Sequence, residues 1–183
     1  MNEEEAAQLV RENIENTRLL YHSFAVESIM RGIAEYLQED VRLWGMCGLL
    51  HDIDFEKVKG DPCKHGIAAE GILRGNVDER VIRAIRAHNG ENTGTVPESA
   101  MERCLISADS VSGLLIASTL VVPTKKLEDL RLETVLRKFR DLDFARGCSR
   151  ERMQACESAG VPIKKLFEIS LRALQAISDK LGL

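Results

Sequence analysis

The chain has 183 residues, of which 44% are hydrophobic, 30% charged and 4% aromatic, an ordinary composition for one soluble globular domain. Its formal net charge of −4 provides no basic surface for a nucleic acid polymer. The longest apolar-leaning run, residues 111–123, is too short to cross a bilayer, so we expect no membrane association. The cysteines form no CxxC pair and the acidic start MNEEEAAQLV lacks a signal peptide's apolar stretch, so we expect a reduced, cytoplasmic protein.

The first part of the chain is predicted to form three capped helices. An asparagine followed by three glutamates predicts a helix over residues 2–16. A second helix is expected over 18–38, where apolar residues recur at helical spacing and His22 lies on the buried stripe. Asp40 is expected to cap a third helix over 41–52, which is apolar nearly all round and should be buried.

This third helix ends on two polar side chains, His51 and Asp52. Both groups are costly to bury unless something pairs with them. A metal ion would satisfy an imidazole and a carboxylate that lie side by side. Alternatively, the helix reaches the surface here and Asp52 caps the next segment.

The remaining helices carry further polar groups on apolar faces. A short helix is expected over 64–73 with His65 on its apolar face, and another, capped by Asp78, with His88 on its apolar stripe. Residues 91–97 are expected to form a loop, and a long helix over 98–120 carries Asp109. Helices over 127–139, 150–158 and 162–182 complete the chain. Strand signals are absent, which predicts an all-α single-domain helical bundle.

The polar groups on these buried positions include all four histidines of the chain: His22, His51, Asp52, His65, His88 and Asp109. Each histidine alone is more simply explained as a hydrogen-bonded core residue. Together they would need a separate buried partner each, whereas one metal site would satisfy several at once. The set therefore favours a metal centre.

The order of these six residues along the chain resembles that of the HD superfamily of metal-dependent phosphohydrolases, especially its HDIG-type branch. The local sequences LLHDID, KHGIAAEGIL, AIRAHN and ISADSVSGLL resemble that branch too. The resemblance covers about residues 19–117. It implies a single helical domain, residues 1–183, in which helices over 124–182 pack on this motif core. Asp54 and Phe55 stand where the HDIG pattern has Gly and often Lys, so no role of that lysine carries over.

The resemblance also implies the ligands and the reaction. The residues that match the first metal site are His22, His51, Asp52 and Asp109. His65 and His88 match positions that bind a second metal, with Asp52 bridging, or that contact the substrate phosphate. We therefore expect one or two divalent ions per chain, of Fe, Mn, Ni or Zn. The expected reaction is hydrolysis of a phosphate ester or anhydride in a small phosphorylated substrate such as a nucleotide, by a phosphohydrolase or phosphodiesterase.

The loop after the HD pair provides further candidates. Asp54 and Glu56 lie close enough in sequence to Asp52 to position the attacking water or protonate the leaving group. Lys64, with Lys57 and Lys59, is a candidate to hold a substrate phosphate. The alternative for all of these side chains is a solvated, charged loop.

Two other classes of function stay open at this point. Similar helical His/Asp frameworks hold redox-active iron, so one alternative is a di-iron oxygenase. The other is a non-catalytic module that binds a metal or a nucleotide. Six ligand-type residues exceed the roughly four that a structural site needs, which favours catalysis. The sequence leaves open whether the protein is a monomer or a homodimer.

Overall fold

Side-chain caps start the helices where the sequence predicts them. In each case a side-chain oxygen accepts a hydrogen bond from a backbone N–H in the first helical turn, which satisfies a group without an intrahelical partner. The Asn2 cap also forms a capping box with Glu5. The three predicted caps are Asn2 at α1 (Glu3–Asn13), Asp40 at α3 (Val41–Leu50) and Asp78 at α5 (Glu79–His88).

The computed structural model describes all residues 1–183, and every regular element in it is a helix. The prediction of an all-α fold is therefore confirmed. The other helices are α2 (Thr17–Leu37), α4 (Ala68–Leu73), α6 (Gly90–Thr93), α7 (Ala100–Leu120), α8 (Leu132–Arg140), α9 (Arg150–Gln154), α10 (Ile163–Gln175) and α11 (Ser178–Leu181), with 3₁₀ turns η1 (Leu127–Asp129) and η2 (Ala155–Ala159).

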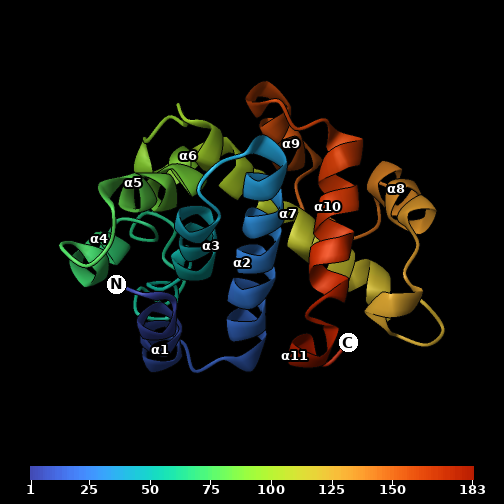
Figure 1. Cartoon of the computed structure of the whole chain (residues 1–183), viewed down its shortest axis with the longest axis horizontal. Coiled ribbons are helices and arrows are strands. Elements are labelled where there is room, and N and C mark those ends of the chain that lie inside the picture. The colour runs from blue at the N-terminus through green and yellow to red at the C-terminus, as the bar shows by residue number, and fades with distance from the viewer.

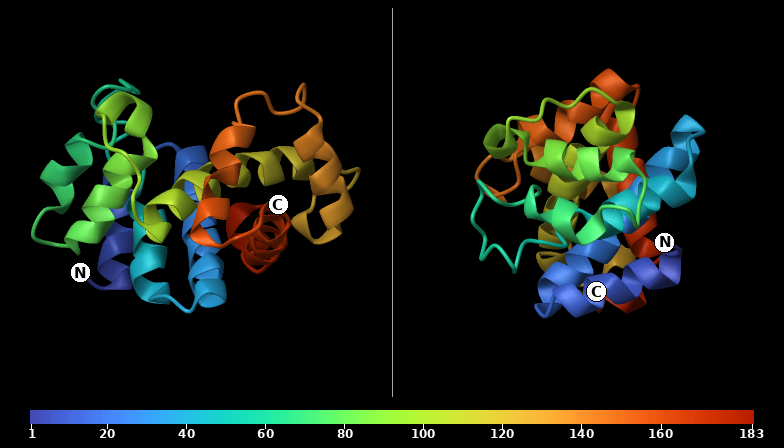
Figure 2. Two further views of the ribbon diagram at one scale, coloured as in Figure 1. Left: turned by 90° about the horizontal axis from the view of Figure 1, so that it is seen from above. Right: turned by 90° about the vertical axis from the view of Figure 1, so that its left-hand side faces the viewer.

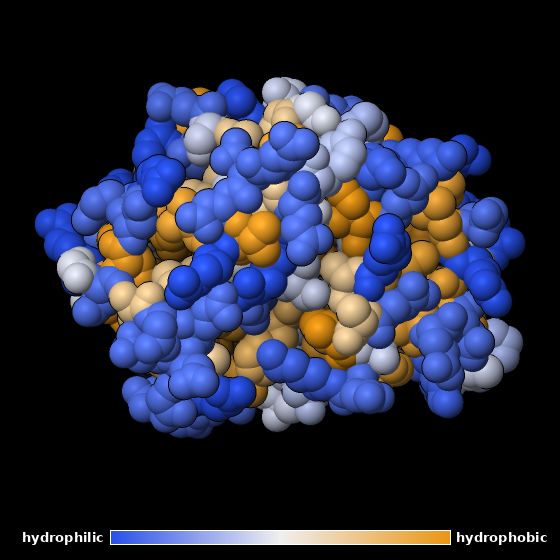
Figure 3. All heavy atoms as spheres, viewed as in Figure 1, coloured by the Kyte–Doolittle hydropathy of each residue, from blue (hydrophilic) through white to orange (hydrophobic).

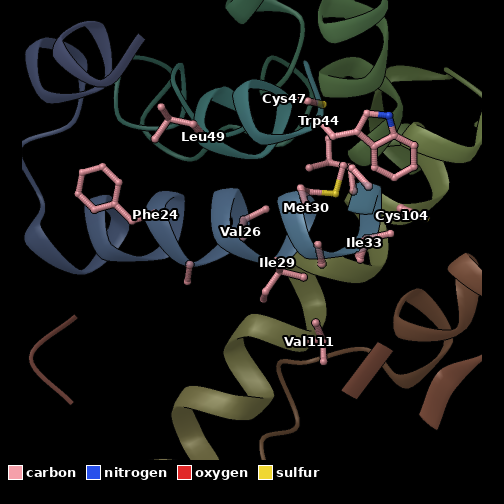
Figure 4. Packing of buried hydrophobic residues seen from close by; sticks show 14 of the residues in the cluster. Phe24, Val26, Ile29, Met30, Ile33, Trp44, Cys47, Leu49, Cys104 and Val111 are labelled. Atoms are coloured by element: carbon pink, nitrogen blue, oxygen red, sulfur yellow. The ribbon is translucent and has the colours of Figure 1, made fainter. Parts of the chain in front are cut away.

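Helix α2 runs through the centre of the molecule (Figure 1) and packs against α3, α7 and α10. The helices α1, α3, α4 and α5 gather on one side of it, and α8 and α10 on the other, which Figure 2 shows from two further directions. The side chains of Ile29, Met30 and Ile33 on α2 belong to the buried core with Trp44 of α3 and Val111 of α7 (Figure 4). The C-terminal helices thus share one core with the helices that precede them.

The close contact between α2 and α3 depends on a glycine. A Cβ atom at Gly48 would lie 2.7 Å from the carbonyl oxygen of Val26 and 2.9 Å from the backbone nitrogen of Glu27. These are backbone atoms, so a larger residue at position 48 requires the two helices to move apart. Since α2 carries His22 and α3 leads into His51, this packing also decides how near the two imidazoles come.

The structure corrects several boundaries. The helix predicted over 127–139 is divided into η1 and α8, and the one predicted over 150–158 into α9 and η2. The helix predicted over 64–73 begins only at Ala68, and residues 51–67 form successive turns, so His65 lies in a turn. The loop predicted over 91–97 includes the short helix α6. The last predicted helix is divided near residue 177 into α10 and α11.

Helix α7 is more apolar than the sequence analysis expected. By length and composition it would suffice to cross a membrane, but 61% of its most apolar window is buried inside the protein, as in the core helix of a soluble fold. On the face seen in Figure 3, hydrophilic residues surround smaller groups of apolar ones. The apolar length of α7 is thus explained by its place in the core.

An ion pair between a buried carboxylate and a partly exposed arginine ties α7 to α5. The Glu102 carboxylate, 4% exposed, accepts hydrogen bonds from Arg83 of α5 (2.6 Å) and from the backbone N–H groups of Glu98 (2.6 Å) and Ser99 (3.3 Å). Burial works to raise the pKa of Glu102, but these hydrogen bonds outweigh it and lower the pKa below its ordinary value. The contact matters for the site because α5 ends on His88 and α7 carries Asp109.

We predict opposite effects of alanine at two helical glycines. Gly48→Ala should lower the free energy of unfolding by about 1–3 kcal/mol, because its Cβ would meet the backbone of α2. Gly71→Ala, with no atom within 4 Å of its Cβ, should raise it by up to about 1 kcal/mol. Urea unfolding of both variants checks this pair, and equal stabilities would contradict the packing argument.

We also predict a pH-dependent effect at Glu102. Because its folded-state pKa is lowered, its contribution to stability is present above its ordinary value of about 4.5 and is lost as the pH falls below it. Glu102→Gln should therefore cost about 1–2 kcal/mol at pH 7 and progressively less below pH 4.5. The control is Glu98→Gln, which removes an exposed partner of the same Arg83 and should change stability little. A deficit for Glu102→Gln that persists at low pH would contradict this origin.

Candidate metal centre

The six residues predicted as metal ligands come together at one place between the helices. They arrive from separate elements: His22 from α2, His51 and Asp52 from the end of α3, His65 from the turn before α4, His88 from the end of α5 and Asp109 from the middle of α7. The side chains of His51, Asp52, His65 and His88 are buried, and those of His22 and Asp109 are partly exposed.

Asp52 lies between two pairs of histidines. Its Oδ2 is 3.4 Å from Nε2 of His51 and 3.7 Å from Nε2 of His22. Its Oδ1 is 3.2 Å from Nε2 of His65 and 3.6 Å from Nε2 of His88. This arrangement gives two groups of three potential ligands, each with a histidine pair, that share the Asp52 carboxylate.

Within each pair the two Nε2 atoms face each other closely. They are 3.1 Å apart between His22 and His51 and 3.0 Å apart between His65 and His88. Asp109 joins the first pair, with its Oδ1 3.2 Å from Nε2 of His22. Every histidine of the chain therefore turns the same ring nitrogen inward.

The opposite nitrogen of two rings donates to a backbone carbonyl. Nδ1 of His51 lies 2.8 Å from the carbonyl oxygen of Gly48, and Nδ1 of His88 contacts that of Ile85. A carbonyl only accepts hydrogen bonds, so Nδ1 must carry the proton in both rings. Nε2 of each neutral ring is then left with a lone pair directed into the cluster.

The other two rings are oriented by side chains. Nδ1 of His65 donates to Oδ1 of Asp54 (2.8 Å). Nδ1 of His22 lies 3.0 Å from Oγ of Ser112, whose own hydroxyl donates to the backbone oxygen of Asp109 (2.8 Å). Since the Ser112 proton is used there, its oxygen accepts from His22. These partners are of the kind that orient metal-bound histidines.

The donor set fits a divalent transition metal. Four Nε2 lone pairs converge on two carboxylates, and none of the paired imidazoles has a proton to share with its neighbour in this tautomer. Two lone pairs 3.0 Å apart repel each other unless a proton or a cation lies near both. Neutral imidazoles and carboxylates are ligands of Fe, Mn, Ni and Zn.

Burial and charge set the protonation of the cluster. Burial lowers the pKa of His51 to about 4, which keeps it neutral at physiological pH. Burial alone would raise the pKa values of Asp52 and Asp109, but the surrounding imidazoles hold both below the ordinary range. Burial also works against a charge on His65, yet its hydrogen bonds to Asp52 and Asp54 raise its pKa to about 9, so a metal that binds Nε2 of His65 has to displace a proton from this ring. Ionised carboxylates and a neutral His51 are the forms that bind a cation.

The structure places Asp54 differently from our expectation of an acid or base beside the attacking water. The side chain is fully buried, behind His65 as seen from the cluster. Oδ1 binds Nδ1 of His65, and Oδ2 accepts from the backbone N–H groups of Gly66 (2.8 Å) and Ala69 (2.9 Å). Asp54 therefore orients His65 and holds the turn that carries it.

Glu56 and Lys64 are also placed differently from the expectation. The Glu56 carboxylate accepts from the backbone N–H groups of Glu15 (2.8 Å) and Asn16 (2.9 Å), so it fastens the α1–α2 connection to this loop. The Lys64 side chain is 71% exposed and pairs with Asp61. Of the three lysines suggested for phosphate binding, Lys59 lines a hollow beside the cluster.

Two residues that contact members of the cluster were not predicted from the sequence. Ser112 follows Asp109 by three positions on α7, a helical spacing from which its contact with His22 could have been anticipated. Arg152 of α9 donates from Nη2 to Oδ2 of Asp109 (3.0 Å), which lies 43 positions away in the sequence. No local sequence pattern predicts that contact.

Two adjoining hollows open at the cluster. One of about 370 Å³ lies over it and is bounded by Asn89, Gly113 and residues 147–149 with Arg152. The other, of about 570 Å³, is lined by Arg18, Phe55 and Lys59 among others, and the two share His22 and Phe55. A Cβ at Gly113 would lie 2.8 Å from Sγ of Cys148, so this glycine lets the 147–149 segment approach the site.

We predict that Asp54→Asn weakens the fold beside the site. An amide nitrogen cannot accept the hydrogen bonds that one of the carboxylate oxygens accepts, so unfolding should cost about 1.5–3 kcal/mol less. Urea unfolding in the presence of a chelator measures this without any contribution from metal. The control, Asp61→Asn, alters a partly exposed carboxylate of the same loop and should change stability much less than Asp54→Asn does. Equal stability of the Asp54 variant and wild type would return Asp54 to the role of a free acid or base.

Comparison with known proteins agrees with the site. The chain matches the HD domain family model over residues 19–138, about two-thirds of its length. The match includes all six residues of the cluster and extends beyond residue 117, where the resemblance seen in the sequence ended. No curated protein and no solved structure matches the chain. With its histidines and aspartates gathered inside the matched region, the chain belongs to the HD domain family, which indicates the metal-dependent hydrolase superfamily.

Proposed function

We propose that this protein hydrolyses a phosphate ester or anhydride bond in a small phosphorylated molecule, such as a nucleotide, with a divalent metal centre. The observation that carries this proposal is the convergence of four Nε2 lone pairs on the shared Asp52 carboxylate at the base of a hollow. A structural metal site would enclose its ion with about four ligands and leave no access from outside. Here five of the six ligand-type residues, all except His51, border an open hollow of about 370 Å³, which leaves room for a phosphoryl group.

The two halves of the cluster would hold one ion each. His22, His51 and Asp109 would bind the first with Oδ2 of Asp52, and His65 and His88 the second with Oδ1 of Asp52. Bound ions would polarise the phosphoryl group and make water a better nucleophile at neutral pH. The acceptors at their Nδ1 atoms orient the imidazoles so that each Nε2 faces the cluster.

The adjoining hollow of about 570 Å³ suits a leaving group that extends away from the phosphate. Phe55, 40% exposed, lies at the boundary of the two hollows with its ring edge-on to His65, at a centroid distance of 5.3 Å. The ring offers an apolar surface for a planar group, and Arg18 and Lys59 add positive charge. These features favour a substrate larger than a simple sugar phosphate, and a nucleotide meets them.

The first test concerns metal binding. Wild-type protein should retain at least one ion of Fe, Mn, Ni or Zn per chain by elemental analysis, and should gain thermal stability when one of these metals is added after chelation. Asp52→Ala should lose most of the metal, because Asp52 belongs to both groups of ligands. Asp61→Asn, a carboxylate change in the same loop, should keep it. Wild-type protein that binds none of these ions and shows no thermal shift would contradict the metal centre.

The second test concerns the reaction. Metal-loaded protein should release inorganic phosphate or cleave a phosphodiester in a screen of nucleotides, without consuming oxygen, and Asp52→Ala should fall to background. Oxygen-dependent turnover of iron-loaded protein without phosphate release would instead support a di-iron oxygenase. Metal binding with neither reaction would support a non-catalytic module, and either result would overturn the proposed hydrolase.

A further inference from the structure

The hollow over the cluster is completed by a side chain from outside the matched region. Arg152 lies in α9, beyond residue 138, where the family match ends. Among the residues that line this hollow it is the only lysine or arginine, while Asp52 and Asp109 contribute negative charge. An arginine stays protonated at any physiological pH, so this position keeps a permanent positive charge at the wall of the site.

The guanidinium of Arg152 is fixed by both helices that flank it. Nη2 donates to Oδ2 of Asp109 on α7 (3.0 Å) and to the carbonyl oxygen of His88 at the end of α5 (2.9 Å). Nε lies 3.4 Å from Oγ of Ser110. Nη1 has no hydrogen-bond partner in the protein, and the side chain is 26% exposed. The group is thus held in place with one edge left to bind something else.

The backbone that carries Arg152 is also anchored. Oγ of Ser107 on α7 donates to the carbonyl oxygen of Arg152 (3.0 Å) and accepts from the N–H of Cys156 (2.9 Å). Two positions earlier, the Arg150 guanidinium donates to six backbone carbonyls at the end of α8 and in the loop that follows it: Lys138, Phe139, Asp141, Phe144, Ala145 and Cys148. Arg150 therefore holds the loop in place, and the backbone that positions Arg152 at the hollow is fixed.

We propose that Arg152 binds the phosphoryl group of the substrate, and that the substrate is a phosphomonoester or another compound with a terminal phosphate. This inference rests on the proposed function. A terminal phosphate has three non-bridging oxygens, so it can face the cluster and still give one oxygen to the free edge of Arg152. A diester has only two, so a hydrogen bond to Arg152 leaves it a single oxygen for the cluster. Charge-assisted hydrogen bonds of this kind are strong and directional.

Arg152 has a competing role, which is to orient Asp109 alone. In that case its loss would change metal binding and turnover but not the affinity for phosphate. In our proposal its loss weakens the binding of phosphate and of the monoester, and the metal content stays near that of wild type. Metal content and phosphate affinity together separate the two roles.

The experiment compares wild type with Arg152→Gln, Arg152→Lys and the control Arg146→Gln, all loaded with the same metal. Arg146 lies on the same segment, 76% exposed and paired with Asp143 alone, so its loss should change nothing measured here. Substrates are p-nitrophenyl phosphate, a monoester, and bis(p-nitrophenyl) phosphate, a diester. Inorganic phosphate is used as a competitive inhibitor, and thermal melts check that each variant folds.

We expect wild type to prefer the monoester. In Arg152→Gln, KM for the monoester and the inhibition constant of phosphate should rise about 10-fold to 100-fold, the usual consequence of losing a hydrogen bond to a charged group. The preference for the monoester over the diester should decrease at the same time, and Arg152→Lys should restore part of that preference. Metal content should stay near that of wild type.

Two results would overturn the inference. One is a Gln variant that loses metal and turnover while its affinity for phosphate is unchanged, which would leave Arg152 a role through Asp109 alone. The other is a wild type that cleaves the diester as well as the monoester. If metal-loaded wild type cleaves neither these substrates nor nucleotides, the proposed function fails instead. Calorimetric titration of inorganic phosphate into wild type and Arg152→Gln then still tests Arg152, and equal affinities for phosphate would refute the proposed contact between Arg152 and the phosphoryl group.

Discussion

The structure around the site depends on one buried carboxylate that faces four imidazoles. Asp52 has an oxygen within 3.7 Å of Nε2 of each histidine in the chain. An ionised carboxylate is costly to bury unless charges or donors surround it, and here the surrounding nitrogens present lone pairs in their neutral form. A divalent cation bound beside Asp52 would resolve both problems, because it would neutralise the carboxylate and use the lone pairs. The helices around the cluster are arranged to meet that demand.

That arrangement rests on contacts just outside the cluster. Each Nδ1 faces an acceptor that sets the tautomer of its ring: the backbone for His51 and His88, Asp54 for His65 and Ser112 for His22. The close approach of α2 and α3 at Gly48 brings the first histidine pair together. The Arg83–Glu102 pair holds α5 on α7 and so relates His88 to Asp109. The geometry of the site therefore depends on the packing of the whole helical core.

The C-terminal segment has a different part in the molecule. It provides no residue of the six-residue cluster, yet residues 147–149 and Arg152 form a wall of the hollow over it. Gly113 permits that wall to approach, and Ser107 fastens its backbone to α7. The ligand residues thus come from the part of the chain that matches the family, whereas a permanent positive charge comes from a segment outside the match.

The sequence by itself determined the features that depend on neighbours within a few residues. Caps such as Asn2, Asp40 and Asp78 and the apolar periodicity placed most helices, and polar residues within apolar segments identified the six residues that come together in the cluster. Only the tertiary structure decided what Asp54 and Arg152 do. Asp54 turns away from the cluster because two backbone N–H groups and His65 bind it, and Arg152 meets Asp109 from 43 positions away. The direction of a polar side chain is set by partners that folding brings near, and their identity is not encoded in local periodicity.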